Sequence, residues 1–372
     1  MKYIDDKHRK LDKNISDLSI KSDILRFIDP INKFDELEKF IDKDGLYKPV
    51  FLYNERHIQA IWDVLDYIKE LYTKLGSYMD RYGDNLTKMM YEKVQELEHK
   101  FKLVMAYHHQ DIDKIVYHNQ ILFGKFADHK SLKLDHKNLL SYSITNIWDF
   151  LSDKIIKSHE QSELIDKKDL KKIIEHSLGK VGIIDFKLKF QDLWRTNMQV
   201  SIWERPVIYI NEKSDYDISS LIISVLHEIY GHLNRWAHAS NTEFYILKWG
   251  TGYYLSTEEG IATFQWARYE WYKDTYDRLE SSYQLWYELH NLNRSDGVEL
   301  LRSTKYKKNE NIFRSLLRWK RWLINVDNHC VFYKDKIYFD GFHDICNFII
   351  KWWDLDKLFL WRIKIFDLQY MS

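Results

Sequence analysis

The sequence predicts an α+β protein that is predominantly helical and carries one small sheet. The chain has 372 residues but only three prolines, so long helices meet few breakers. Through most of the first half, apolar residues recur at intervals of three and four, which is the spacing of one helix face. Between residues 186 and 210 they alternate with polar residues instead, which is typical of half-buried strands.

The composition is that of a globular protein, and it argues against some classes of partner. Hydrophobic residues make up 45% and aromatic residues 16%, which is enough to build a core. Basic and acidic residues number 56 each, so we expect no nucleic-acid partner, which would favour a basic excess. No apolar run approaches the roughly 20 residues of a membrane span, and the charged first residues do not resemble a signal peptide. Cys330 and Cys346 are expected to be buried thiols. The expected setting is cytoplasmic, away from membranes.

The first half reads as a series of helices. One pattern runs from Asn54, a candidate N-cap, to Leu75, with Gly76 as a stop signal. A second pattern extends over Leu86–Met105. Further helical patterns cover about residues 111–122, 137–157 and 168–178. We therefore expect residues 1–178 to form a helical N-terminal part.

The pattern changes near Gly179. Strands are predicted over residues 186–190, 198–202 and 207–210. A helical pattern then runs from Ile218 past His232, and helices dominate again from about Ser256, apart from a strand-like pair near residues 331–333 and 336–339. Residues 179–372 are expected to form a second part, packed with residues 1–178 into one compact unit.

The most informative motif is the hexapeptide His227–His232, in which Glu228 follows the first histidine. In the HExxH motif of zinc peptidases the two histidines lie four residues apart on one helix face, and the glutamate is the general base. Here they lie five apart, which on a regular α-helix separates the imidazoles by about 140°. A π-type bulge absorbs one extra residue, and Gly231 tolerates such a distortion. The motif therefore predicts a metal site if the helix is locally widened, and ordinary surface histidines otherwise.

A carboxylate pair downstream supplies the preferred third ligand. Catalytic zinc commonly takes two histidines and one carboxylate, so the pair Glu258 and Glu259 is a candidate source of the third ligand. The alternative for Glu259 is a capping box with Ser256. His238 is a rival third ligand at the interval used by metzincins, but Arg235 stands where their motif has a glycine.

These motifs resemble those of the tubulin-tyrosine carboxypeptidase (MATCAP-like) metallopeptidases, whose bacterial relatives are the QEGLA-motif flavohemoglobin-expression-modulating proteins. The stretches that carry the resemblance are His227–His232, Gly252–Ala262, Arg318–Arg321 and Tyr333–Gly341. One departure is Glu258, which replaces the glutamine of the family motif, and another is Ile261 in place of its leucine.

The resemblance implies a zincin-like metallopeptidase fold with the small sheet beside the motif helix. It implies that His227, His232 and Glu259 hold one Zn²⁺ per chain and that Glu228 is the catalytic base. It also implies a carboxypeptidase that removes a C-terminal, tyrosine-like residue from a protein tail, with an acidic, tubulin-like tail as the expected partner. The second hypothesis is a metal-binding regulatory or protein-interaction module without hydrolytic activity.

Several further residues are candidates for substrate binding. The segment 302–321 holds a local excess of basic residues, and a half-buried arginine can grip a terminal carboxylate, so Arg318, Lys320 and Arg321 are predicted to anchor the substrate's end. The strand that contains Met198 and Val200 is predicted to pair with an extended substrate, although an ordinary buried strand fits equally well. The residue that stabilises the oxyanion is left open among four tyrosines, namely Tyr230, Tyr253, Tyr254 and Tyr338.

Overall fold

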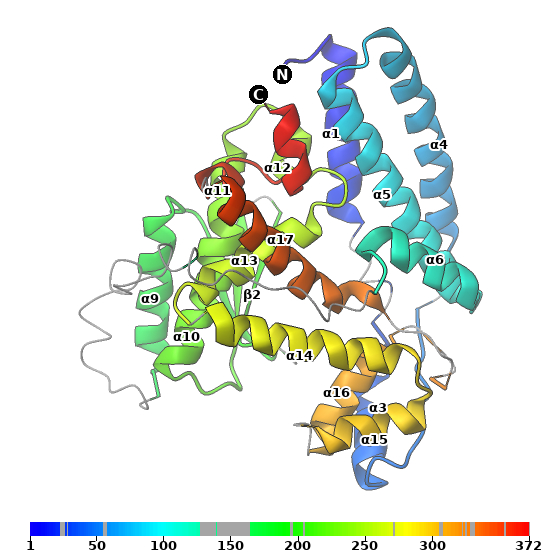
Figure 1. Ribbon diagram of the computed structural model, residues 1–372, viewed down its shortest axis with the longest axis vertical. Coiled ribbons are helices and arrows are strands. Elements are labelled where there is room, and N and C mark those ends of the chain that lie inside the picture. The colour runs from blue at the N-terminus through cyan, green and yellow to red at the C-terminus, as the bar shows by residue number, and fades with distance from the viewer. Residues whose placement is uncertain are drawn as a thin grey trace. The chain divides into compact units, whose positions relative to one another are not determined.

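The computed structural model describes most of the chain (Figure 1). The residues outside the description are 23–26, 28, 55–57, 127–138, 140–163, 194–195, 204, 271, 305–307, 322, 324–325, 328–331, 353–354 and 372. The helix predicted over residues 137–157 lies almost entirely outside the described residues, as does Cys330. Cys346 is a buried free thiol, as expected. No described helix combines the length and the apolar character that crossing a bilayer requires.

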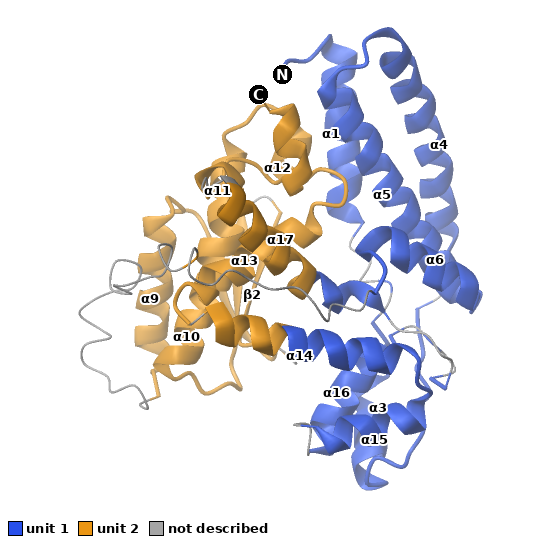
Figure 2. Ribbon diagram, in the orientation of Figure 1, with its two compact units in different colours: residues 1–129, 280–337 blue, residues 130–279, 338–372 orange. Residues whose placement is uncertain are grey.

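The chain divides into two compact units, and each is made of two separate pieces (Figure 2). Unit 1 contains Met1–His129 and Glu280–Ile337, and unit 2 contains Lys130–Leu279 and Tyr338–Ser372. The boundary predicted between residues 178 and 179 does not coincide with this division. That boundary followed the change from helical to alternating patterns, whereas the units are defined by which segments pack together.

Unit 1 begins with helices whose N-termini are capped by aspartates. Helix α1 spans Asp6–Lys21, α4 Ile58–Arg81, α5 Asn85–His108 and α6 Ile112–Phe123. Asp5, Asp84 and Asp111 each accept a hydrogen bond from a backbone N–H in the first turn of the helix that follows. The helical patterns predicted near α5 and α6 are confirmed.

The stop predicted at Gly76 is wrong, because α4 continues to Arg81. A helical glycine costs only about 1 kcal/mol relative to alanine. The extra turn is held by Tyr78, whose ring stacks on His8 and whose hydroxyl donates to Asp5. The predicted cap at Asn54 is not tested, since α4 is described only from Ile58.

The remainder of unit 1 is also helical. It contains α3 (Lys33–Asp42), α15 (Arg294–Ser303), α16 (Asn309–Trp319) and the 3-10 helix η5 (Tyr333–Lys336). Phe40 and Phe313 pack together, which joins α3 to α16. The strand-like pair expected near residues 331–339 is wrong for its described part, since η5 leads directly into α17 (Ile337–Trp352). Aromatic residues suggested strands there, but the buried side chains of α17 recur at helical spacing.

Unit 2 contains the predicted small sheet. Strand β1 spans Lys187–Gln191, β2 Met198–Ile202 and β3 Pro206–Asn211. The order is β1-β3-β2, with β1 parallel and β2 antiparallel to β3. Strand β2 is therefore an edge strand, and the three strand predictions are confirmed.

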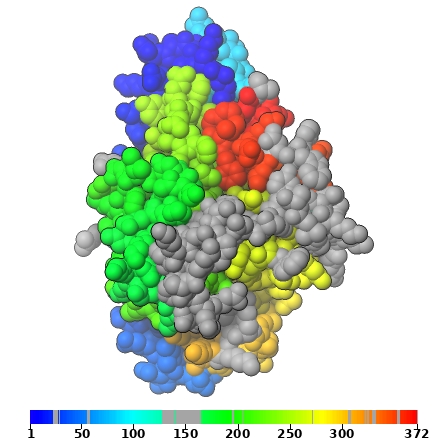
Figure 3. Space-filling model, turned by 90° about the vertical axis from the view of Figure 1, so that its left-hand side faces the viewer, coloured from blue at the N-terminus to red at the C-terminus, as the bar shows by residue number. Residues whose placement is uncertain are grey.

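Helices cover the sheet and form the core of unit 2. The helix α9 (Lys167–Lys180), α10 (Ile218–Val225) and the π-helix η4 (Leu226–Leu233) contribute buried aliphatic side chains to one cluster with β2 and β3. Ile174, Val225 and Ile229 from these helices and Ile208 from β3 are fully buried in it. The opposite side of α9 carries lysines and faces solvent, on the face shown in Figure 3.

The other described elements of unit 2 are helices. They are α11 (Asn234–Ser240), α12 (Tyr245–Trp249), α13 (Leu255–Ala267), α17, and the 3-10 helices η6 (Asp356–Leu358) and η7 (Ile365–Tyr370). Helix α14 (Tyr272–His290) begins in unit 2 and ends in unit 1. Helix α13 is buried along its length, so its side chains are shielded from bulk water.

Candidate metal centre

The helix that carries the histidine motif widens at that motif. Residues before Leu226 and after Leu233 are α-helical, and the eight residues between form η4. A π-helix adds nearly one residue to each turn, so residues five apart lie on one face. The imidazole centroids of His227 and His232 accordingly lie 4.9 Å apart. The predicted widening is confirmed.

Two glycines allow α13 to approach its neighbours closely. A Cβ atom on Gly231 of η4 would lie 2.6 Å from the Cα of Ala262, and a Cβ on Gly260 would lie 2.3 Å from the carbonyl oxygen of Gly341. Gly231 does not have a positive φ, so its role here is close packing rather than an unusual torsion. Because η4 and α13 touch at this point, the residue next to Gly260 is brought to the histidines.

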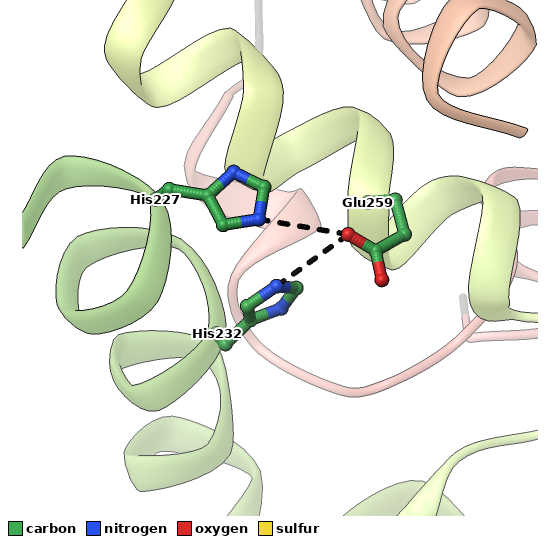
Figure 4. Close-up of side chains that lie close together, drawn as sticks. All are labelled: His227, His232 and Glu259. Carbon is green, nitrogen blue, oxygen red and sulfur yellow. Dashed lines mark ion pairs between the residues drawn. The ribbon is translucent and has the colours of Figure 1, made fainter. Parts of the chain in front are cut away.

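That residue is Glu259, and it faces both imidazoles (Figure 4). Its Oε2 atom lies 3.6 Å from Nε2 of His227 and 3.6 Å from Nε2 of His232. This buried oxygen has no hydrogen-bond partner. Within the described ranges, these three residues are the sole group of at least three histidine, cysteine or acidic side chains whose ligand atoms converge, all within 4.8 Å.

The three side chains fit a zinc ion. Tetrahedral zinc with bonds of about 2.1 Å separates its ligand atoms by about 3.4 Å, close to the 3.6 Å of each imidazole–carboxylate contact. Two imidazole nitrogens and one carboxylate oxygen are a donor set found in catalytic zinc sites. An unpaired buried carboxylate oxygen is costly unless a cation is nearby.

Neither the capping box between Ser256 and Glu259 nor a third ligand at His238 is found in the structure. Ser256 lies inside α13, whose N-cap Tyr254 makes no side-chain capping bond, so Ser256 and Glu259 form no capping box. His238 is exposed on α11 and is not part of the cluster.

Glu258 is held on the other side of His232. Its Oε1 atom accepts a hydrogen bond of 3.3 Å from Nδ1 of His232. Arg235 donates to Oε2 at 2.7 Å, and Arg362 donates to Oε1 at 3.1 Å. Glu258 is 3% exposed and Arg235 only 1% exposed, so this is a buried ionic cluster. The sequence does not predict this cluster, because Arg235 appears in it only as a departure from the metzincin motif and Arg362 carries no signal.

Glu228 is placed between the sheet and the cluster. Its Oε2 atom accepts a hydrogen bond of 3.2 Å from the backbone N–H of Val200 on β2. Burial raises the pKa of Glu228, which the nearby imidazoles only partly offset. A carboxylate with a raised pKa is suited to taking up and releasing a proton near neutral pH.

Without a metal ion, the electrostatics of the cluster favour an ionised Glu259 and a protonated His232. Burial alone would raise the pKa of Glu259, but the imidazoles of His227 and His232 hold it well below its usual range. At 3.6 Å these contacts are electrostatic rather than hydrogen bonds. Burial alone would lower the pKa of His232, but Glu258 and Glu259 raise it to about 10. Glu259 is therefore ionised, which is the form that binds metal, whereas His232 has to release a proton when a metal ion binds.

A comparison with known protein families bears on this centre. The family model described as microtubule-associated tyrosine carboxypeptidase matches residues 38–267, which is more than half of the chain. The chain belongs to this family. A search among curated proteins finds no match. The matched range includes η4 and α13, so His227, His232 and Glu259 all lie within the region shared with the microtubule-associated tyrosine carboxypeptidase family. Membership implies a hydrolase of the carboxypeptidase class.

The predicted carboxylate anchors lie outside the range matched to the microtubule-associated tyrosine carboxypeptidase family, and they belong to unit 1. Arg318 pairs with Asp335. Lys320 is fully buried, donates to the carbonyl oxygen of Leu292 at 3.3 Å and lies over the ring of Trp319. The Arg321 side chain is 13% exposed and lies 4.0 Å from Asp29. Their role as anchors stays a prediction, and the metal centre itself is in unit 2.

The remaining candidates lie in unit 2. Met198 is buried and Val200 is half-buried on β2. Of the tyrosines, Tyr254 accepts a hydrogen bond from Arg362, and burial raises the pKa of Tyr230 to about 12. Tyr338 is partly buried in the first turn of α17. Tyr253 has a φ of 58°, an uncommon torsion for a non-glycine residue, directly before α13. The choice among them for the oxyanion stays open.

Proposed function

We propose that the protein is a zinc-dependent carboxypeptidase with a zincin-like fold, in which His227, His232 and Glu259 bind the metal ion. The observation that carries the proposal is the convergence of these three side chains on one point, with the buried Oε2 of Glu259 lacking any other partner. Glu228 beside them gives the site a base, which a purely structural metal site does not need. The cytoplasmic location inferred from the sequence belongs to the same proposal.

In the proposed mechanism, Glu228 is the residue that transfers protons. The chemistry that a bound zinc ion supplies is polarisation of the scissile carbonyl and acidification of water. Glu228 takes a proton from the attacking water and later gives it to the leaving amine, a role worth about 10²–10⁴ in rate. The Val200 N–H fixes one carboxylate oxygen of Glu228 at 3.2 Å, so the base is oriented before the substrate arrives.

The free edge of β2 is suited to an extended substrate. Among the described strands, β2 pairs with β3 on one side only, and the Val200 N–H points to Glu228, away from β3. Because directions alternate along a strand, the backbone groups of Met198 and Ile202 lie on the same outward edge. A peptide that pairs with this edge runs past Glu228.

The substrate that we propose is a C-terminal protein tail ending in an aromatic, tyrosine-like residue. The support for this specificity is the family's description, which names tyrosine and microtubules. An acidic tail would complement the basic segment that contains Arg318 and Arg321.

The first test is metal content. Elemental analysis of the purified protein should give about one zinc per chain, and His227→Ala, His232→Ala or Glu259→Ala should each abolish it. His238→Ala, an exposed position outside the cluster, is the control and should retain zinc. Wild-type protein without a stoichiometric transition metal would overturn the proposal.

The second test asks whether cleavage requires a free C-terminus on the substrate. Mass spectrometry should detect removal of the last residue from peptides with a free, tyrosine-ending C-terminus, and amidation of that terminus should suppress most of the cleavage. Arg321→Ala should reproduce the loss on the free acid. Equal cleavage of free and amidated peptides would indicate an endopeptidase instead. Zinc binding without any cleavage would favour the regulatory module.

A further inference from the structure

We propose that Glu258 is a positioning residue for the metal centre, and that the C-terminal segment Leu358–Ile363 supports it through Arg235 and Arg362. This inference rests on the proposed function, because it concerns how His232 is presented to the metal ion. It adds residues that lie beyond the three ligands and the base.

The first step is the orientation of His232. Its two ring nitrogens face two different carboxylates: Nε2 faces Glu259 at 3.6 Å, and Nδ1 lies 3.3 Å from Glu258. An imidazole that donates its Nδ1–H to a carboxylate has its Nε2 lone pair free and its ring plane fixed. Glu258 therefore selects the tautomer of His232 that can bind metal through Nε2.

The second step is the support of Glu258 itself. Arg235 and Arg362 donate to its two different oxygens, so the carboxylate cannot rotate without breaking a charge-assisted hydrogen bond. Arg362 also donates to the hydroxyl of Tyr254 at 3.1 Å. Two buried guanidinium groups around one carboxylate also explain why a charged glutamate suits this position.

The third step connects the C-terminal segment. Arg235 donates to the backbone carbonyl oxygens of Leu358, Trp361 and Ile363, at distances of 2.5–3.0 Å. The backbone of Arg362 is fixed in turn, since its N–H donates to Leu247 at 3.0 Å and its carbonyl accepts from Thr251 at 3.0 Å. The segment that follows α17 thus holds both arginines that hold Glu258.

Two substitutions at Glu258 separate positioning from structural support. In Glu258→Gln the amide oxygen is favoured at the Oε1 position, where both His232 and Arg362 donate, so the acceptor for His232 is kept while the charge is lost. In Glu258→Ala both the acceptor for His232 and the negative charge are lost. Both variants leave two buried guanidinium groups uncompensated, so both should lower the melting temperature.

The experiment measures zinc affinity by chelator competition, together with thermal unfolding of the metal-free protein, on the full chain. We expect Glu258→Ala to weaken zinc binding by about 10- to 100-fold, and Glu258→Gln to restore most of that loss. Arg362→Met should weaken binding as well, since it removes one support of Glu258. Asp367→Asn is the matched control: Asp367 is buried in η7, directly after this segment, and accepts a hydrogen bond from Thr251, but does not touch Glu258.

The outcomes are distinct. Asp367→Asn should lower the melting temperature and leave zinc affinity within about twofold of wild type. The inference is overturned if folded Glu258→Ala binds zinc as tightly as wild type, if Glu258→Gln is as weak as Glu258→Ala, or if Asp367→Asn loses as much affinity as Arg362→Met. Failure of the proposed function is a separate result, because wild-type protein would then bind no zinc at all.

Discussion

Glu228 combines three properties that a general base needs: it is buried, it lies beside the metal-binding cluster, and one of its oxygens is fixed by the Val200 N–H. The substitution Glu228→Gln preserves its shape and its capacity to accept that hydrogen bond, but an amide cannot take up the proton. We expect kcat/KM to fall by about 10²–10⁴ while zinc content stays at wild-type level. Steady-state kinetics and elemental analysis on the same preparation test this, and turnover near wild type would remove Glu228 from the mechanism.

At the residue scale, the sequence predicted the side chains that converge but not the ones that support them. The motif spacing, the rules of zinc chemistry and the family resemblance together lead to His227, His232 and Glu259. The role of Glu258 depends on Arg235 and Arg362, which lie 23 and 104 residues away along the chain, and no local pattern joins them. The resemblance makes Glu259 rather than Glu258 the ligand, which by itself predicts that Glu258→Ala keeps most zinc. The contact with His232 now favours the opposite result.

At the scale of elements, the close crossing of η4 and α13 is what joins the histidines to Glu259. We expect Gly231→Ala to destabilise the protein by roughly 1–3 kcal/mol and to weaken zinc binding, because its Cβ would meet the backbone of Ala262. Denaturant unfolding and chelator competition measure the two effects. Gly179→Ala on α9 is the control: nothing lies within 4 Å of its added Cβ, so it should stabilise slightly. Similar behaviour of both variants would contradict this account of the crossing.

A second prediction at this scale concerns the packing of α5 against α6. His118 on α6 is 6% exposed, and burial lowers its pKa to about 4, with the nearby His99 adding to the effect. In the unfolded chain a histidine titrates near 6.5, so below that pH the unfolded state binds a proton that the folded state does not. Folding stability should therefore fall as the pH drops from about 6.5 to 4.

The variant His118→Gln removes this contribution, which is on the order of 3 kcal/mol. Urea unfolding at pH 7 and pH 4.5 should show a smaller loss of stability in the variant than in wild type. His176→Gln, at an exposed position on α9, should follow wild type. A loss in His118→Gln equal to that of wild type would show that His118 is not held neutral.

The elements themselves were largely predictable, because apolar spacing reports directly on which face is buried. The three strands and the helices near residues 85–123 and 167–180 follow that rule. It fails where a local signal is weaker than tertiary packing. Gly76 does not end α4 because Tyr78 anchors the next turn, and the aromatic run near Tyr333 is helical because its neighbours pack at helical spacing.

At the scale of the whole molecule, the chain passes between the two units three times, and no composition shift marks these crossings. Linear patterns cannot reveal that residues 338–372 belong with the histidine motif, since contacts rather than composition place them there. The boundary predicted at residue 178 therefore marks the region where the sheet begins rather than the edge of a unit.

This organisation predicts that unit 2 cannot form without the end of its second piece. A chain ending at Trp352 lacks Arg362, the carbonyl groups that hold Arg235, and the buried side chains of Leu358 and Ile363. We expect it to bind no stoichiometric zinc and to unfold at a lower temperature than wild type. A chain shortened only by its last two residues is the control and should retain both properties. Full zinc occupancy in the shorter chain would contradict this dependence.

The late position of Arg362 also has a consequence for biosynthesis. A ribosome makes the histidines and Glu259 well before it makes Arg362, which follows Glu258 by 104 residues. The three donors therefore leave the ribosome while Glu258 still lacks one of the two guanidinium groups that fix it. We therefore expect the finished geometry to form only after Arg362 has been made, and nascent chains stalled before Arg362 should retain zinc less tightly than chains that include it.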